Sequence, residues 1–309
     1  ITTNTKAVNF IFFIGDYPSN KENIKIKGIT IVGDKLQRKY IAFGIKNYNK
    51  NEIYNKNIEI DSCNFKNLDH CIIVNNTNDL KITNNTFSNS NNVFVSLNNA
   101  KVLVENNKLE RINKGLIFAD EGSKANYDIK LINNDIKKIT GYPIHFSDVS
   151  PKASHQNVLI DKNIIKGDTI PYSKKADGGS ADQISVHGSE NVEIIKNESV
   201  GGGDMGITIT NCKNVDILNN ISAYNDRSGI VLSGGNENIN ISNNILYNNG
   251  QRADGLYVNT GILLYSGKIN GNFKVNISNN KIYDNQKNPT QLSEIEDYGP
   301  NNRFKIIED

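Results

Sequence analysis

Five side chains that can exchange protons or bind an anion lie in or just before one strand-like segment of neighbouring repeat units. His145 stands in "YPIHFSD" and His187 in "DQISVHG", while Asp182, Asp204 and Arg227 stand shortly before such segments. Imidazole titrates close to neutral pH, which suits a general acid or base. Two carboxyl groups can form an acid–base pair, and a guanidinium can bind an anion. These residue types predict acid–base chemistry on a negatively charged substrate.

The segments that carry these residues belong to a repeat with a unit of about 22 residues. Each unit alternates apolar and polar residues, is rich in Ile and Val, and places an Asn at one marker position. The markers are Asn85, Asn107, Asn134, Asn163, Asn197, Asn220, Asn244 and Asn280, with Cys63 and Ile29 in the same slot. Alternation with period 2 indicates short strands, and a unit this short buries its apolar face only by stacking on its neighbours.

This repeat predicts an all-β fold, a right-handed parallel β-helix of about ten coils. The marker side chains are expected to stack as an internal Asn ladder, bonding to one another and to backbone groups that the turn leaves unpaired. We expect one domain over residues 1–309. Because the ends of a solenoid expose strand edges, caps are expected at about 1–20 and 288–309.

The longest insertions flank one strand of each unit, which we call the front strand. The interval of 34 residues between Asn163 and Asn197 carries the largest of them, "KGDTIPYSKKADGGSADQ". If the Ile residues at 144, 184, 207, 230 and 262 point inward, the outward neighbours form two columns. The first contains His145, Ser185 and Thr208, and the second contains Ser147, His187, Thr210, Ser233 and Tyr265. Because long loops grow where function requires them, we expect a polar groove here.

The groove hypothesis assigns His187, Asp182, Asp204 and His145 as catalytic residues. The expected substrate-binding residues are Arg227, Tyr142, Lys174, Lys175, Ser185, Thr210 and Tyr265. A purely structural interpretation stays open, in which the Ser, Thr and Lys residues are simply solvated. In that interpretation Asp204 and Arg227 form a surface ion pair worth under about 1 kcal/mol.

Calcium is a candidate cofactor, because it prefers carboxylate oxygen ligands. Asp177, Asp182 and Asp204 offer such ligands near the groove, although no loop has a calcium-binding spacing.

The stretch "NESVGGGDMGITITNCKNVDILNNISAYNDRSGIVL" resembles the catalytic module of bacterial mannuronan C5-epimerases. These modules belong to the pectate-lyase-like β-helix superfamily of polysaccharide lyases, hydrolases, epimerases and phage depolymerases. The resemblance places Arg227 on the family's substrate-binding Arg and His187 on its catalytic His. The family's Asp-Pro-His carboxylate falls on Ser185, the Tyr before it on Asp182 and a second catalytic Asp on Thr210. The resemblance therefore implies the fold and an acidic polysaccharide substrate more directly than it implies the reaction.

The leading functional hypothesis is cleavage of a uronic-acid-containing polysaccharide by β-elimination. His187 or His145 would be the base, Arg227 with a loop Lys the neutraliser, and Tyr142 or Tyr265 the acid. The alternatives are a hydrolase that uses Asp182 and Asp204, a C5-epimerase, and a glycan-binding or adhesive solenoid without activity.

Composition and charge argue against nucleic acid and membranes as partners. A net charge of +2 with scattered basic residues gives no field for nucleic acid. The longest apolar run, "VNFIFFIG", is too short to span a membrane. The superfamily implies an extracellular, secreted or virion-associated protein, and a homotrimer if the chain belongs to a phage spike. Three cysteines without metal-type spacing are expected to be buried side chains.

Overall fold

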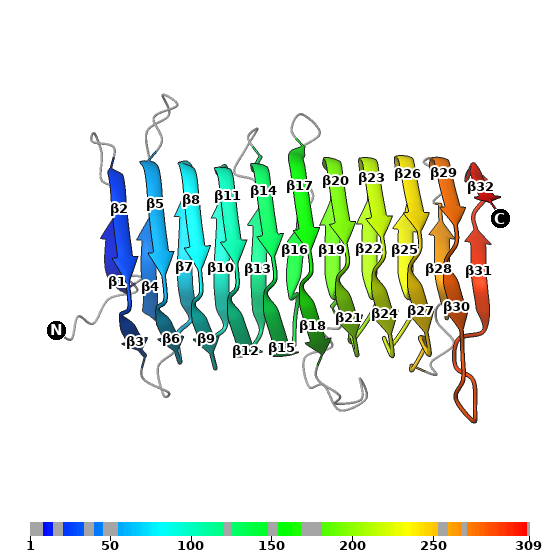
Figure 1. The fold of residues 1–309 in the computed structure, drawn as a ribbon, viewed down its shortest axis with the longest axis horizontal. Coiled ribbons are helices and arrows are strands. Elements are labelled where there is room, and N and C mark those ends of the chain that lie inside the picture. Colours follow the sequence, from blue (N-terminus) through cyan, green and yellow to red (C-terminus); the bar gives the residue numbers. More distant parts are fainter. Residues whose placement is uncertain are drawn as a thin grey trace.

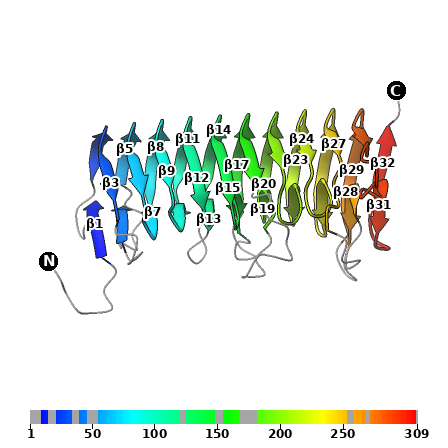
Figure 2. The same ribbon diagram turned by 90° about the horizontal axis from the view of Figure 1, so that it is seen from below.

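The computed structural model describes residues 9–14, 21–33, 40–45, 55–119, 125–147, 154–167, 181–252, 259–266 and 271–307. Within these ranges every regular element is a strand. Each strand pairs only with the equivalent strands of the neighbouring coils. Figure 1 shows the strands following one another along a single axis from the N-terminal to the C-terminal coil. The view from below in Figure 2 shows the same stacking. The chain is a right-handed parallel β-helix, as its repeat predicts.

Three parallel sheets make up the solenoid. The front sheet, which contains the predicted front strands, has 11 strands within the described ranges. They are β1 (Asn9–Ile14), β4 (Tyr40–Ile45), β7 (His70–Asn75), β10 (Asn92–Leu97), β13 (Lys114–Ala119), β16 (Ile144–Phe146), β19 (Ile184–His187), β22 (Ile207–Thr210), β25 (Ile230–Ser233), β28 (Thr260–Tyr265) and β31 (Ser293–Tyr298).

The second sheet also has 11 strands among the residues that the structure describes. They are β2 (Glu22–Lys27), β5 (Asn55–Asp61), β8 (Thr77–Thr83), β11 (Ala100–Glu105), β14 (Tyr127–Ile132), β17 (His155–Asp161), β20 (Ser189–Ile195), β23 (Lys213–Leu218), β26 (Glu237–Ser242), β29 (Phe273–Ser278) and β32 (Phe304–Ile307).

The third sheet has 10 strands in the described part of the chain. They are β3 (Thr30–Val32), β6 (Asn64–Lys66), β9 (Thr86–Ser88), β12 (Lys108–Ile112), β15 (Asp135–Ile139), β18 (Ile164–Gly167), β21 (Glu198–Val200), β24 (Ile221–Ala223), β27 (Ile245–Tyr247) and β30 (Lys281–Tyr283). The segments expected to cap the two ends include β1, β31 and β32, which extend the front and second sheets.

The core is a continuous stack of inward side chains from all three sheets. Ile is the most frequent residue of this core, and aromatic rings stack from coil to coil in the N-terminal half. Phe118 and Phe146, for example, lie with ring centroids 4.5 Å apart and an interplanar angle of 7°. Such registered packing holds successive coils in a fixed position, so side chains on the outer face of a sheet are also held in columns.

The predicted Asn ladder runs through the turn between the second and third sheets. Each marker side chain donates from Nδ2 to Oδ1 of the next, at 3.1 Å from Asn85 to Asn107 and 3.0 Å from Asn220 to Asn244. The same Oδ1 atoms accept backbone N–H groups, and Cys63 continues this pattern by donating its N–H to Asn85. The ladder therefore satisfies backbone groups that the turn leaves buried.

The first Asn of each Asn-Asn pair has a different function from the second. Asn84, Asn106 and Asn219 adopt positive φ angles of 56°, 56° and 57°, in the left-handed region. Asn tolerates this region better than other residues with a side chain. The pair is therefore one left-handed turn residue followed by one ladder residue, which explains why it repeats.

Two further polar columns occupy the other turns. In the turn after the front sheet, the N–H of Asn99 donates to Asn126, and the N–H of Asn126 donates to Nδ1 of the buried His155 at 3.2 Å. In the turn before the front sheet, Asn225 donates to Asn249 at 2.9 Å. This last column fixes the chain immediately before Arg227.

Replacing Asn220 with Ala should destabilise the protein by about 1–3 kcal/mol, because buried partners lose their hydrogen bonds. A lower melting midpoint in thermal or urea unfolding is the expected observation. Asn240 is the matched control, since its side chain lies on the outer face and donates to Asp216 at 3.1 Å. Equal losses for Asn220→Ala and Asn240→Ala would show that the buried ladder adds nothing beyond a surface hydrogen bond.

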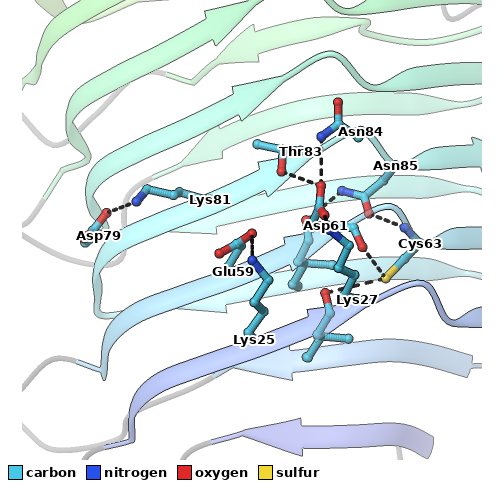
Figure 3. Close-up of polar contacts among 12 residues, drawn as sticks. Lys25, Lys27, Glu59, Asp61, Cys63, Asp79, Lys81, Thr83, Asn84 and Asn85 are labelled. Carbon is cyan, nitrogen blue, oxygen red and sulfur yellow. Dashed lines mark hydrogen bonds and ion pairs between the residues drawn. The ribbon is translucent and has the colours of Figure 1, made fainter.

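The N-terminal end of the ladder carries a buried carboxylate, Asp61, shown in Figure 3. It accepts hydrogen bonds from Asn84 at 2.8 Å and Thr83 at 3.0 Å, and Lys27 Nζ lies 3.0 Å away. The hydrogen bond from Asn84, followed by that from Lys27, holds the pKa of Asp61 well below its usual value.

Because this pKa is lowered in the folded state, ionised Asp61 stabilises the fold at neutral pH. That contribution is present above the unfolded pKa of about 3.9 and is lost as the pH falls below it. Asp61→Asn should therefore melt below the wild type at pH 7, and the gap should narrow below about pH 4. A gap that stays constant from pH 7 to pH 3 would contradict this assignment.

Candidate active site

The front strands have the register that the sequence predicts. Ile144, Ile184 and Ile207 are aligned and fully buried, and Ile230 and Ile262 continue the row. The first outward column aligns His145 with Ser185 and Thr208, and the second aligns His187 with Thr210, Ser233 and Tyr265. β16, β19 and β22 therefore present three coils of polar side chains on one outer face.

The two histidines lie side by side on this face. Their ring centroids are 5.5 Å apart at an angle of 64°, and the Tyr142 ring lies 4.5 Å from that of His145. Ser185 Oγ lies 2.7 Å from His187 Nε2. Burial, followed by the charges of His187 and Lys114, lowers the pKa of His145 to about 4. His145 is therefore neutral at pH 7.

One ring nitrogen of His145 is buried without a partner in the described part of the chain. Its Nδ1 is buried and has no hydrogen-bond partner among the described residues. A neutral imidazole nitrogen in that state can accept a hydrogen bond from a bound hydroxyl group.

Asp182 precedes β19 and is the most strongly perturbed carboxyl group of the cluster. Its Oδ1 accepts the backbone N–H of Met205 at 3.3 Å. Burial, followed by the negative charge of Asp204, raises the pKa of Asp182 to about 7. The nearby Thr208 hydroxyl, the backbone N–H of Met205 and the Ser185 hydroxyl oppose that rise. A carboxyl group with this pKa exchanges protons at neutral pH, which is what an acid–base catalyst requires.

Asp204 lies one coil further along the solenoid and pairs with Arg227. Arg227 Nε is 2.9 Å from Asp204 Oδ1, and the backbone N–H of Arg227 donates to the Asp204 carbonyl at 3.1 Å. Only 4% of the Arg227 side chain is exposed. The interpretation of these residues as an ordinary surface ion pair is therefore wrong, because a buried guanidinium needs a fixed anionic partner.

Tyr142 connects the histidines with the carboxylates. Its ring contacts His145, and burial, followed by the charges of Asp182 and Asp204, raises its pKa. Tyr142, the two histidines and the two aspartates thus form one group, which we call the front-sheet cluster, together with Ser185 and Arg227.

The other predicted site residues differ in burial and in distance from the histidines. Ser185 and Thr208 are buried, so they are not solvated strand residues, whereas Thr210 is half-buried. Tyr265 is three coils from His187 in the same column, about 14 Å along the axis at the usual strand spacing. Lys174 and Lys175 lie outside the described residues.

Sequence reasoning did not single out Lys114 or Gln183. Lys114 affects the pKa of His145 from the preceding coil. Gln183 lies between Asp182 and β19, is buried, and keeps its Oε1 without a partner among the described residues. The sequence repeat locates both residues at the start of a front strand. A single Lys or Gln there forms no recognisable motif, so neither could be singled out.

The groove and the calcium site remain predictions. The insertion expected to form one wall lies mostly outside the described residues, as does Asp177. Among the residues that the structure describes, no three His, Cys, Asp or Glu side chains form a metal-binding group. A cleft of about 270 Å³ lies elsewhere, at the C-terminal end between Ile277 and Ile307.

The stacked sheets and the front-sheet cluster define a parallel β-helix protein with a group of titratable side chains on one face. The chain belongs to the family described as the right handed beta helix region, whose model matches residues 92–291. Comparison with curated proteins found no match.

Solved structures share the fold at low identity. The periplasmic alginate epimerase AlgG has a TM-score of 0.52 and 11% identity, over 96% of this chain and 76% of that one. A DFA-IIIase from Arthrobacter chlorophenolicus A6 has a TM-score of 0.51 and 10% identity, over 87% of this chain and 67% of that one. Tailspike protein 3 of bacteriophage CBA120 has a TM-score of 0.49 and 12% identity over 96% of this chain, which spans 55% of that protein.

Proposed function

We propose that this protein cleaves a uronic-acid-containing polysaccharide by β-elimination, with the front-sheet cluster as its active site. The observation that carries the proposal is the grouping of two histidines, a tyrosine and two aspartates, with the His145 ring 5.5 Å from that of His187 and 4.5 Å from that of Tyr142. The pKa of Asp182, raised to about 7 by burial and by the charge of Asp204, supports it. Perturbed carboxyl groups grouped with histidines and a tyrosine are typical of acid–base sites. The likeness in fold to an alginate epimerase supports an acidic polysaccharide as the substrate class.

In this reaction a base removes the proton from the carbon that bears the carboxylate. The electron pair forms a double bond to the next carbon, and the bond from that carbon to the glycosidic oxygen breaks. An acid then protonates the leaving oxygen. His187 is the proposed base, because neutral imidazole accepts protons near pH 7.

Asp182 is the proposed acid, because a carboxyl group with a pKa of about 7 is partly protonated at neutral pH and can donate. The pKa of Tyr142 is raised, so its hydroxyl stays protonated and can donate a hydrogen bond to the substrate. Arg227 Nε lies 2.9 Å from Asp204 Oδ1, which places a positive charge against this carboxyl group beside Asp182.

A carboxylate-pair hydrolase is the second candidate. The observation that favours it is the different surroundings of the two carboxyl groups: the pKa of Asp182 is raised by burial, whereas Asp204 pairs with Arg227. Hydrolases use one protonated and one ionised carboxyl group in this way. A C5-epimerase would begin with the same proton removal but would return a proton to the opposite face of the carbon.

Product analysis on a panel of uronate polymers separates these reactions. β-Elimination produces an unsaturated uronate that absorbs ultraviolet light, hydrolysis produces reducing ends without that absorbance, and epimerisation leaves the chain length unchanged. An adhesive solenoid would bind the polymer without changing its absorbance, its reducing ends or its chain length.

Because a polysaccharide substrate occurs outside the cytoplasm, we propose an extracellular, periplasmic or virion-associated setting for the protein. None of the described residues forms a helix that could cross a membrane.

A further inference from the structure

The second outward column of the front sheet continues beyond the cluster into two exposed tyrosines. His187 aligns with Thr210, then Ser233, then Tyr265, and finally Tyr298 of β31. The Tyr265 and Tyr298 rings are nearly parallel, at 10°, with centroids 6.0 Å apart. Their exposed fractions are 42% and 58%. An aromatic pair thus stands on the outer face, in line with the proposed base.

The residues between His187 and this pair are small. Thr210 and Ser233 have short hydroxyl side chains and are half-buried. They therefore protrude less from the outer face than His187 and Tyr265 on either side. Successive parallel strands are about 4.8 Å apart, which places Tyr265 about 14 Å and Tyr298 about 19 Å from His187 along the axis. Several sugar units of an extended chain fit within that span.

From this geometry we propose that Tyr265 and Tyr298 form a distal sugar-binding subsite, and that the substrate chain lies along the solenoid axis from His187 toward the C-terminal coils. The inference rests on the proposed function. Tyrosine suits this position, because its ring provides apolar contact for the faces of sugar rings and its hydroxyl hydrogen-bonds to sugar hydroxyls. The subsite makes the protein selective for chains long enough to reach it.

The test compares Tyr298→Ala and Tyr265→Ala with Tyr224→Ala on a long uronate polymer and on a uronate disaccharide or trisaccharide. Tyr224 is the matched control, since it is also 42% exposed but follows β24 of the third sheet. Both front-sheet variants should raise KM for the polymer about 5- to 20-fold and leave kcat nearly unchanged. Neither should alter KM for the short substrate, and Tyr224→Ala should match the wild type throughout.

Equal polymer KM values for the wild type and the two front-sheet variants would overturn the subsite while the proposed function stands. Loss of activity on short and long substrates alike would also overturn it, because a distal subsite cannot affect a substrate that does not reach it. If the wild type cleaves no uronate polymer, the proposed function fails. Affinity electrophoresis in uronate and neutral polysaccharide gels then decides the subsite: weaker retardation of Tyr298→Ala supports it, and unchanged or absent retardation refutes it.

Discussion

Asp182→Asn should lower kcat/KM on a uronate polymer by about 10²- to 10⁴-fold, the usual contribution of a general acid or base. The substitution keeps the size of the side chain. The amide oxygen of Asn can still accept the hydrogen bond from the backbone N–H of Met205. It removes the proton that Asp182 is proposed to deliver to the leaving oxygen. Steady-state kinetics on purified polymer measures the effect.

The pH dependence of kcat/KM tests the role of Asp182 more closely. If its protonated form is the acid, activity should fall as the pH rises through about 7. Asp204→Asn should move this limb to lower pH, because the charge of Asp204 is the second largest cause of the raised pKa. A limb that stays in place in Asp204→Asn would mean that another group sets it.

Stability provides the control for Asp182→Asn. Because the pKa of Asp182 is raised in the folded state, its contribution to stability is present below the unfolded pKa of about 3.9 and is lost as the pH rises through about 7. Asn at this position cannot ionise, so the variant should melt at or above the wild-type temperature at pH 8. A lower melting temperature there would indicate that Asp182 is structural rather than catalytic.

His187→Ala should lower kcat by about 10²- to 10⁴-fold and leave KM for the polymer nearly unchanged. The proposed base acts on one proton in the transition state, whereas polymer binding is spread over many contacts. His70→Ala is the matched control, since His70 begins β7 of the same front sheet, four coils from His187 and outside the cluster. Its effect on kcat should stay within about 3-fold, because it has no proposed part in proton transfer.

Full activity in His187→Ala together with its loss in Asp182→Asn and Asp204→Asn would reverse the assignment. The hydrolase would then be the better account, because it needs only the two carboxyl groups.

The fold was predictable because each coil repeats the same solution to the same problem. Every coil needs inward apolar residues at period 2 and a side chain that bonds the buried backbone of its turn, so Asn85 and Asn220 mark equivalent places from sequence alone. Once Ile184 and Ile207 are assigned inward, the register of His187 and Thr210 follows without reference to loops.

The electrostatics of the site could not be predicted in the same way. Sequence reasoning favoured His187 over any carboxyl group, because an Asp needs burial before it can act near pH 7. The burial of Asp182 depends on the packing of neighbouring coils, which strand periodicity does not report. Sequence spacing aligns Asp204 with Arg227, but it does not reveal that Arg227 is almost completely buried.

The other polar columns were missed for a related reason. They use mixed residue types, such as Asn126 followed by His155 in one turn and Asn249 followed by Gln291 in another. Without a single repeated residue, a column is visible only when the coils are stacked in space.

The most direct test of the central claim is the ultraviolet absorbance of products formed from uronate polymers by the wild type, Asp182→Asn and His187→Ala. We expect absorbance to rise with time for the wild type, in step with falling polymer length, and to be reduced at least about 100-fold in both variants. Polymer shortening by the wild type without any rise in absorbance would contradict β-elimination, and an unchanged polymer across the panel would contradict cleavage altogether.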